Sequence, residues 1–300
     1  MSLTVSVAGL TKTFGSVTAV RDLTFDVQPG RVTGFLGPNG AGKTTTLRMA
    51  LGLVRPTAGT ATIGGRRYAE LPKPLHTVGA ALEATGFHPG RTARNHLRVV
   101  GATAGIGLGR VDEVLGQVGL ADSAGRRVGG YSLGMRQRLA LAQALLGDPT
   151  VLLLDEPANG LDPEGIAWLR GFLRHLAGQG RTVLVSSHVL TEVQQTVDDV
   201  IIISRGQLVR QASLAELDGP TATVVTTPTP QPLLAALAQA GLRVTSPRGS
   251  PNRIEVIGAE PAQVGALAYA AGVELHELSH SSKDLETVFL GLTGDRTEAA

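Results

Sequence analysis

The sequence has 300 residues, a formal net charge of +2 at pH 7 and no cysteine. The length suits one large domain and a smaller one, and the lack of cysteine excludes a disulfide framework and a thiolate metal site. The basic residues are scattered rather than clustered, so we expect no nucleic-acid partner. No stretch approaches the roughly 18 apolar residues of a membrane span, and the N-terminus lacks the apolar core of a signal peptide. We therefore expect a cytoplasmic protein.

The first chemical signal lies between residues 32 and 45. Val32–Leu36 predicts a buried strand, and a helix is expected from residue 43 to about residue 53. The segment between them matches G-x-x-x-x-G-K-[ST], a loop whose backbone N–H groups surround the phosphates of a nucleotide such as ATP. Lys43 is expected to reach the β- and γ-phosphates, and the Thr44 hydroxyl to bind Mg²⁺. The predicted nucleotide-binding residues of this loop are Gly37, Pro38, Asn39, Gly40, Ala41, Gly42, Lys43, Thr44 and Thr45.

A chance match to this loop is the alternative, because glycine is abundant in the chain. Lysine, however, occurs only at positions 12, 43, 73 and 283. The loop also stands between a predicted strand and a predicted helix, which is the context that the motif requires. The N-terminus of that helix attracts anions by itself, so phosphate binding is the favoured interpretation.

A second chemical signal follows the apolar segment 151–154. Asp155 and Glu156 come directly after this predicted strand, at the edge of a parallel sheet where ligands bind. Asp155 is placed to hold Mg²⁺ through water, and Glu156 to polarise the water that attacks the γ-phosphate. The alternative is a strand that ends in solvated acids. The phosphate-binding loop upstream favours the functional interpretation.

The chain is predicted to divide near residue 219, into a domain of residues 1–218 and a C-terminal domain of residues 219–300. Before this point short apolar strands alternate with helical stretches, which is typical of an α/β fold with a mainly parallel sheet. After it, strands are expected at 222–226, 242–246, 253–257 and 273–278, with helices at 232–240 and 261–271. This βαββαβ order predicts a small α+β, ferredoxin-like domain. A closing helix is expected at 283–292.

The segment 131–138, Tyr-Ser-Leu-Gly-Met-Arg-Gln-Arg, precedes the second acidic strand by one helix. It resembles the signature motif of ABC-type ATPases, usually L-S-G-G-Q followed by a basic helical stretch. Other landmarks of that family follow in order over residues 3–218. Phe14 occupies the place of an aromatic that stacks on adenine, Glu83 the Q-loop position, residues 158–162 the D-loop and His188 the switch histidine. The resemblance implies a P-loop ABC ATPase domain with a helical subdomain.

Each landmark also has a plainer interpretation. Phe14 could be an ordinary strand-edge aromatic, and His188 a surface histidine after an apolar strand. Ser132 could simply cap the following helix. The cap and the functional role are compatible, because a capped helix N-terminus is also a phosphate site. The position of His188 at the end of a strand favours a role at the γ-phosphate.

Two departures from the family pattern stand out. Leu133 and Met135 replace the usual Gly and Gln of the signature, whereas Ser132 and Gly134 are kept. Glu83 replaces the usual Gln of the Q-loop. A carboxylate at this position can be a Mg²⁺ ligand, tune hydrolysis or couple the subunit to a partner, and the sequence leaves these roles open.

The resemblance implies a mechanism and a set of partners. Two such subunits, either a homodimer or a pair with a similar chain, close head to tail, so that Ser132 and Gly134 of one contact the nucleotide of the other. Glu156 orients water, while Lys43 and His188 stabilise charge on the γ-phosphate. Transport requires a separate integral membrane subunit, which places this chain on the inner face of the cell membrane. The segment 79–87 is similar to ABC-2-type exporters of the drug, antibiotic and bacitracin-resistance branch.

Two other functional classes of the family fit the sequence less well than transport does. DNA-repair and chromosome-structuring relatives carry a long coiled coil between the loop and the signature, and no heptads occur here. Translation-associated relatives carry two cassettes, and a second phosphate loop is absent from the sequence. A sensing role and an importer ATPase remain open, and the choice of an exporter depends on resemblance alone.

Overall fold

The computed structural model describes residues 2–82, 86–218, 222–245 and 252–281. These residues form two compact units, of which the first ends at Leu214 and the second begins at Ala215. The division lies within the short helix α8 (Leu214–Asp218), so the domain boundary expected after residue 218 remains a prediction. Glu83 and the closing helix expected at 283–292 lie outside the described residues.

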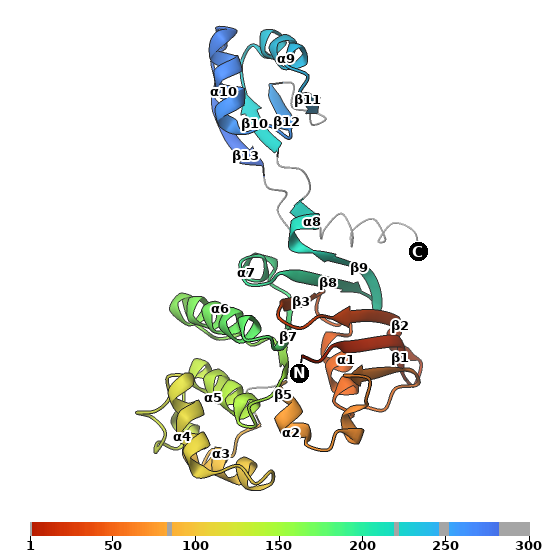
Figure 1. Ribbon diagram of the computed structural model, residues 1–300, viewed down its shortest axis with the longest axis vertical. Helices are drawn as coiled ribbons and strands as arrows, with labels where there is room; N and C mark the ends of the chain where they lie inside the picture. Colours follow the sequence, from red (N-terminus) through yellow and green to blue (C-terminus); the bar gives the residue numbers. More distant parts are fainter. Residues whose placement is uncertain (1, 83–85, 219–221, 246–251, 282–300) are drawn as a thin grey trace. The chain divides into compact units, whose positions relative to one another are not determined.

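The larger unit is built on a six-stranded sheet that carries the predicted loop (Figure 1). The strand order is β5-β6-β7-β3-β8-β9; the first five strands run parallel, and β9 is antiparallel to β8. Their continuous Val, Leu and Ile runs suit strands that are covered on both faces. The mainly parallel sheet expected from the sequence is confirmed. The strands are β3 (Val32–Leu36), β5 (Val78–Ala81), β6 (Val151–Asp155), β7 (Thr182–Ser187), β8 (Asp199–Ser204) and β9 (Gln207–Ser213).

A second, antiparallel sheet lies beside the first. Its strand order is β2-β1-β4, with β1 (Val5–Phe14) between β2 (Val17–Val27) and β4 (Ala58–Ile63). Buried side chains of β1 and β2 join helix α1 (Lys43–Ala50) and the parallel sheet in one hydrophobic cluster. This shared core fixes α1, and therefore the loop before it, against both sheets.

Three helices form the helical subdomain that the resemblance implied. Helices α3 (Ala93–Ala102), α4 (Leu108–Gln117) and α5 (Leu133–Leu145) contact one another, and Figure 1 shows them gathered at one end of the unit. The remaining helices of this unit are α2 (Pro74–Thr77), α6 (Pro163–Gly178) and α7 (Leu190–Gln194), with short 3-10 turns at Tyr68–Glu70 and Val128–Gly130. α5 also packs on β5, and α6 on β7.

The helix after the loop is shorter than expected. It ends at Ala50 rather than near residue 53, because Leu51 leaves helical geometry and Gly52 adopts a φ of 70°. A glycine in this left-handed conformation commonly ends a helix. Leu53 beyond it is apolar but mostly exposed. Its hydrophobicity therefore made the predicted helix too long.

The smaller unit has the element order β10-α9-β11-β12-α10-β13, the order that the sequence predicts. Its antiparallel sheet has the strand order β11-β12-β10-β13, and the two helices contact each other and the sheet. Its core consists of apolar side chains from β10, β12, α9 and α10. The elements are β10 (Ala222–Thr226), α9 (Pro230–Gln239), β11 (Arg243–Thr245), β12 (Arg253–Ile257), α10 (Pro261–Ala270) and β13 (Glu277–Ser281).

The last of these strands was wrongly placed by the sequence pattern. β13 runs from Glu277 to Ser281 rather than over 273–278, and pairs with β10 in the register Thr226↔Glu277. Val273 instead closes the end of α10, where its N–H donates to Ala268 O at 2.9 Å, and its side chain packs on the core. The apolar residue therefore marks the helix-to-strand turn and not the strand.

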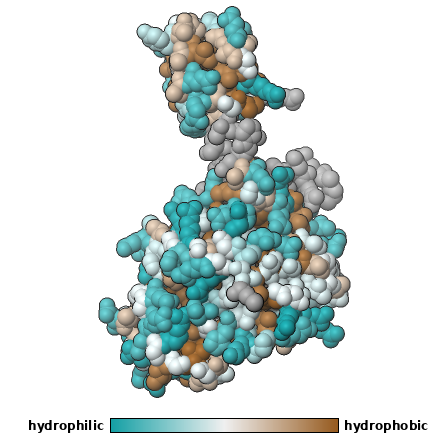
Figure 2. All heavy atoms as spheres, in the orientation of Figure 1, coloured by the Kyte–Doolittle hydropathy of each residue, from teal (hydrophilic) through white to brown (hydrophobic). Residues whose placement is uncertain are grey.

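In the described part of the chain, none of the helices has the length and hydrophobicity needed to cross a bilayer. Figure 2 shows hydrophilic residues over much of the visible face of the larger unit, with hydrophobic residues interspersed among them.

Candidate nucleotide-binding site

The predicted loop leads from β3 directly into α1, as the motif requires. Gly42 precedes the helix with a φ of 104°, a backbone conformation that side chains rarely tolerate. A Cβ at this position would also lie 2.6 Å from Ala19 O. Glycine is therefore required here for both reasons, and α1 begins with its free N–H groups beside the loop.

Lys43 is the first residue of this helix and is buried, with 6% of its surface exposed. Its Nζ donates to Gly37 O at 2.6 Å and to Pro38 O at 3.3 Å. The same atom lies 3.6 Å from Glu156 Oε1. The side chain thus holds a positive charge inside the loop and close to the acidic strand end.

Thr44 and Asp155, separated by 111 positions in the sequence, meet through their side chains. Thr44 Oγ1 donates to Asp155 Oδ2 at 2.6 Å, and Ser186 Oγ donates to Asp155 Oδ1. The described residues contain no group of three or more His, Asp or Glu side chains that could hold a metal by themselves. A hydroxyl and one carboxylate are nevertheless the oxygen donors that Mg²⁺ uses when phosphates complete its shell.

Glu156 follows β6 in a left-handed backbone conformation, with a φ of 49°. Its N–H donates to Ser186 Oγ at 3.0 Å, and its carbonyl accepts from Gln137 Nε2 at 3.3 Å. Its carboxylate Oε2 lies 2.8 Å from Nδ1 of His188, which follows the end of β7. Glu156 is therefore held at its backbone and its side chain by other elements.

Lys43, Thr44, Glu156 and His188 line a cavity of about 380 Å³. Ala19 and Asn159 also line it, together with the other loop residues. Phe14 is not part of this lining; it ends β1 with half of its surface exposed, and Lys12 Nζ lies 4.8 Å from the centre of its ring. The cavity is lined by Ala19, Asn39, Gly40, Ala41, Gly42, Lys43, Thr44, Thr45, Glu156, Asn159 and His188.

The signature segment lies apart from this cavity. Ser132 caps α5 by accepting from Met135 N at 3.2 Å, and neither Ser132 nor Gly134 is among the residues that line the cavity. The preceding Tyr131 is buried and donates to Ser123 O at 2.6 Å. Desolvation raises the pKa of this phenol, with Arg126 opposing the shift. The cap expected for Ser132 is confirmed.

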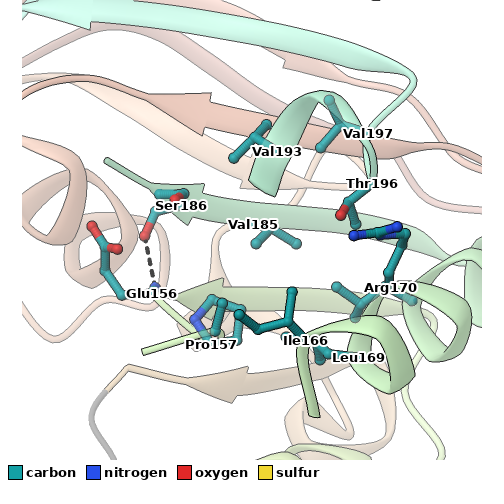
Figure 3. Close-up of a pocket in the computed structure, with 13 residues that line it drawn as sticks. Glu156, Pro157, Ile166, Leu169, Arg170, Val185, Ser186, Val193, Thr196 and Val197 are labelled. Atoms are coloured by element: carbon teal, nitrogen blue, oxygen red, sulfur yellow. Dashed lines mark hydrogen bonds between the residues drawn. The ribbon is translucent and has the colours of Figure 1, made fainter. Parts of the chain in front are cut away.

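A second, apolar cavity of about 30 Å³ lies behind Glu156 (Figure 3). Pro157, Ile166 and Leu169 line one side of it, and Val185 and Val193 belong to β7 and α7. Ser186 lies where this cavity meets the acidic residues, with its hydroxyl on Glu156 N. Glu156 thus borders both this apolar cavity and the cavity beside the loop.

The sequence predicts that Lys43, Thr44, Asp155, Glu156 and His188 belong to one site. In the structure Thr44 contacts Asp155, and Glu156 contacts both Lys43 and His188. The prediction did not single out Ser186, Gln137 or Asn159. A serine near the end of an apolar strand, two positions before His188, was the available signal for Ser186. The contact of Gln137 depends on the packing of α5 and has no local sequence signal.

Comparison with known proteins agrees with this geometry. A family model described as ABC transporter matches residues 20–159, and one described as a domain of unknown function matches residues 221–286. The bacitracin transport ATP-binding protein BcrA of Bacillus licheniformis is 44% identical over 214 residues, which cover 70% of this chain and 70% of that protein. The chain belongs to the ABC transporter ATP-binding proteins. It is therefore an ATP-binding subunit that hydrolyses ATP to drive transport.

Two further matches define how far the likeness extends. The uncharacterized ABC transporter ATP-binding protein YhcH of Bacillus subtilis (strain 168) is 35% identical over 301 residues, covering 99% of this chain and 98% of that protein. A solved structure of an ATP-binding subunit of an ABC transporter superposes with a TM-score of 0.64 at 26% identity, covering 71% of this chain and 91% of that one. The YhcH match thus includes both units.

Proposed function

We propose that this ABC ATPase powers the export of a small molecule, a drug or antibiotic, through a separate membrane subunit. The support is the 44% identity to a protein named for bacitracin transport, together with the phosphate-binding loop, Asp155, Glu156 and His188. The subunit is placed on the inner face of the cell membrane, where it contacts the integral membrane subunit. An importer is the second candidate of the same class, and no contact in the described residues favours it.

The observation that carries the ATPase part of the proposal is the set of contacts that link Thr44 to Asp155, and Glu156 to Lys43 and His188, beside one cavity. The loop N–H groups and the N-terminus of α1 bind the phosphates. Lys43 and His188 stabilise the charge on the γ-phosphate, and Glu156 orients and polarises the attacking water. Most of the rate enhancement then comes from positioning and electrostatics.

Mg²⁺ is the proposed metal, with Thr44 and Asp155 as its protein partners. The donor set fits, because both groups offer oxygen atoms and Mg²⁺ binds one or two carboxylates beside substrate phosphates. When bound, the ion neutralises negative charge on the β- and γ-phosphates. The role of Glu83 as a third metal contact remains a proposal that concerns a residue outside the described part of the chain.

We further propose that two subunits close head to tail over ATP. Ser132 and Gly134 lie away from the cavity of their own chain, so a second copy or a similar chain must bring its signature to the nucleotide. Phe14 is proposed to stack on adenine from the end of β1. The C-terminal domain, residues 219–300, is proposed to regulate the ATPase, because the nucleotide-binding residues named here all precede it.

The decisive experiment is Glu156→Gln, which keeps the shape of the side chain but makes it a much poorer base. ATP binding should be preserved, phosphate release should fall by about 100-fold or more, and ATP should trap a dimer during size-exclusion chromatography. Glu164→Gln is the matched control, because Glu164 is an exposed acid in the first turn of α6. A wild-type rate of phosphate release in Glu156→Gln would remove Glu156 from the catalytic role.

Export itself is tested in cells that express the wild-type subunit or Glu156→Gln together with the membrane protein of a neighbouring gene. Bacitracin is the first compound to test. Resistance with the wild type and sensitivity with Glu156→Gln are expected. Uptake of the compound that depends on ATP hydrolysis would support the importer instead.

A further inference from the structure

Ser186 is a buried hydroxyl that neither the motifs nor the family landmarks assign. It lies on β7 directly opposite Asp155 of β6 in the parallel register, and none of its surface is exposed. Figure 3 shows its side chain turned toward Glu156, between that residue and the apolar cavity. The residue therefore touches both members of the acidic pair.

The single hydroxyl of Ser186 makes two hydrogen bonds of opposite direction. It donates its only proton to Asp155 Oδ1 and accepts from Glu156 N at 3.0 Å. A hydroxyl has one proton and two lone pairs. Because Ser186 donates its proton to Asp155, it can only accept in its hydrogen bond with Glu156. The N–H of Glu156 also approaches Ser186 O at 3.2 Å, which keeps the two strand ends together.

The consequence for Asp155 is a fixed carboxylate plane. Oδ1 is engaged by Ser186, which leaves Oδ2 facing the Thr44 hydroxyl. Only 7% of the surface of Asp155 is exposed, so water can hardly replace a lost donor. Partners of this kind orient metal-binding carboxylates and tune their affinity.

The consequence for Glu156 concerns its backbone. A φ of 49° is rare for residues other than glycine and persists only where surrounding contacts hold it. Ser186 holds the N–H side of this residue and Gln137 the carbonyl side. This conformation directs the Glu156 carboxylate toward Lys43 and His188.

We propose that Ser186 is a positioning residue for ATP hydrolysis, whose one hydroxyl fixes the Asp155 carboxylate and the Glu156 backbone together. The inference rests on the proposed roles of those two residues. The neighbouring Ser187 has no such part, because its hydroxyl accepts from Val189 N at 3.0 Å. Ser186 acts through Asp155 and Glu156 and is not among the residues that line the 380 Å³ cavity.

The test compares four variants of the full chain. Ser186→Ala removes the hydroxyl, and Ser186→Val and Ser186→Thr form an isosteric pair that differs only in the hydroxyl. Ser186 is among the residues that line the apolar cavity of about 30 Å³, so there is open space next to the changed side chain. Thr182→Val is the control, since Thr182 is a fully buried hydroxyl at the other end of the same strand, bonded to Leu3 O.

Two readouts are needed. Steady-state ATPase assays should give a kcat about 10–100-fold lower in Ser186→Ala and Ser186→Val, with KM for ATP nearly unchanged. Binding of a fluorescent ATP analogue, measured with EDTA and with a Mg²⁺ titration, should show unchanged affinity without metal and a Mg²⁺ requirement raised about 10-fold or more. Ser186→Thr and Thr182→Val should resemble the wild type in both assays.

The outcomes separate the inference from the proposed function. Lower thermal stability in Ser186→Ala, with kcat and Mg²⁺ dependence unchanged, would show a merely structural serine and overturn the proposal. A Thr variant as impaired as the Val variant would also overturn it, because the hydroxyl would not be responsible. If Glu156→Gln kept the wild-type rate, the catalytic assignment would fail, yet the shift in Mg²⁺ dependence would still test the link to Asp155.

Discussion

The two units of this chain use polar side chains in opposite ways. In the larger unit, polar side chains of α1 and of the residues that follow β6 and β7 line one cavity, and Asp155 at the end of β6 accepts hydrogen bonds from Thr44 and Ser186. In the smaller unit the buried cluster is apolar throughout, and the buried Thr223 hydroxyl donates to the backbone carbonyl of Ala259 at 2.6 Å. The polar groups of the larger unit can bind a nucleotide and take part in its hydrolysis, whereas the apolar cluster of the smaller unit stabilises the fold of that unit.

Sheet type explains the difference. In a parallel sheet the carboxyl ends of neighbouring strands meet at one edge, so the residues that follow β3, β6 and β7 come together there. In the antiparallel sheet of the smaller unit neighbouring strands end at opposite edges. Among the described residues of the smaller unit, the sheet therefore does not bring the ends of all its strands to one edge.

The largest expected effect on ATP binding comes from a substitution in the larger unit that leaves the smaller unit unchanged. Lys43→Ala removes the buried charge that faces the loop carbonyls and Glu156, so ATP affinity should fall about 30-fold or more. A fluorescent nucleotide titration measures this loss. Lys73→Ala, at an exposed lysine, should leave the affinity unchanged, and equal losses in both variants would contradict a specific phosphate contact.

The converse change is Ile254→Ala in the core of the smaller unit. Ile254 is fully buried among apolar side chains, so the truncation should destabilise this unit by about 2–5 kcal/mol. Hydrogen exchange followed by mass spectrometry should show faster exchange in residues 222–281, while ATP affinity stays at the wild-type value. A matching loss of ATP affinity would mean that the two units are not independent in nucleotide binding.

The comparison also shows what the sequence can predict. The loop, Asp155 and Glu156 could be found because each motif is local and stands beside a strongly apolar strand. Ser186 offered only its place near the end of an apolar strand and Gln137 offered no local signal, because their contacts with Glu156 depend on the register of β6 against β7 and on the packing of α5. The same limit applies to the smaller unit, where Val273 fits a strand pattern but closes a helix.

Phe14 was suggested by position alone, and its half-exposed ring gives no local signal that separates a stacking site from an ordinary strand end. Glu83 was identified by a single departure from a family pattern, and the described residues add nothing to it. Predictions from sequence were therefore strongest where one motif requires both a particular backbone conformation and a particular side chain, as the phosphate-binding loop does at Gly42 and Lys43.

A smaller effect is expected at the contact between the signature and the D-loop-like segment. A Cβ on Gly160 would lie 2.2 Å from Leu133 Cδ2, and Gly160 has a φ of 77°. Gly160→Ala should therefore destabilise the protein, and Leu133→Gly should relieve the steric part of that loss. Urea unfolding of both single variants and the double variant should give a coupling energy of about 0.5–3 kcal/mol. Strict additivity would show that Leu133 does not restrict this segment.

The smallest expected effect concerns Lys12, whose Nζ lies 4.8 Å from the centre of the Phe14 ring and donates to Arg55 O at 2.8 Å. Lys12→Met keeps the length of the side chain but removes the cation–π contact, which is worth about 0.5–1 kcal/mol at an exposed site. If Phe14 stacks on adenine, the less firmly held ring should weaken ATP binding about two- to fivefold and leave tripolyphosphate binding unchanged. Lys73→Met controls for the loss of one positive charge. Equal weakening of ATP and tripolyphosphate would instead assign Lys12 to the phosphates, and Phe14 would then lose this support for a role in base recognition.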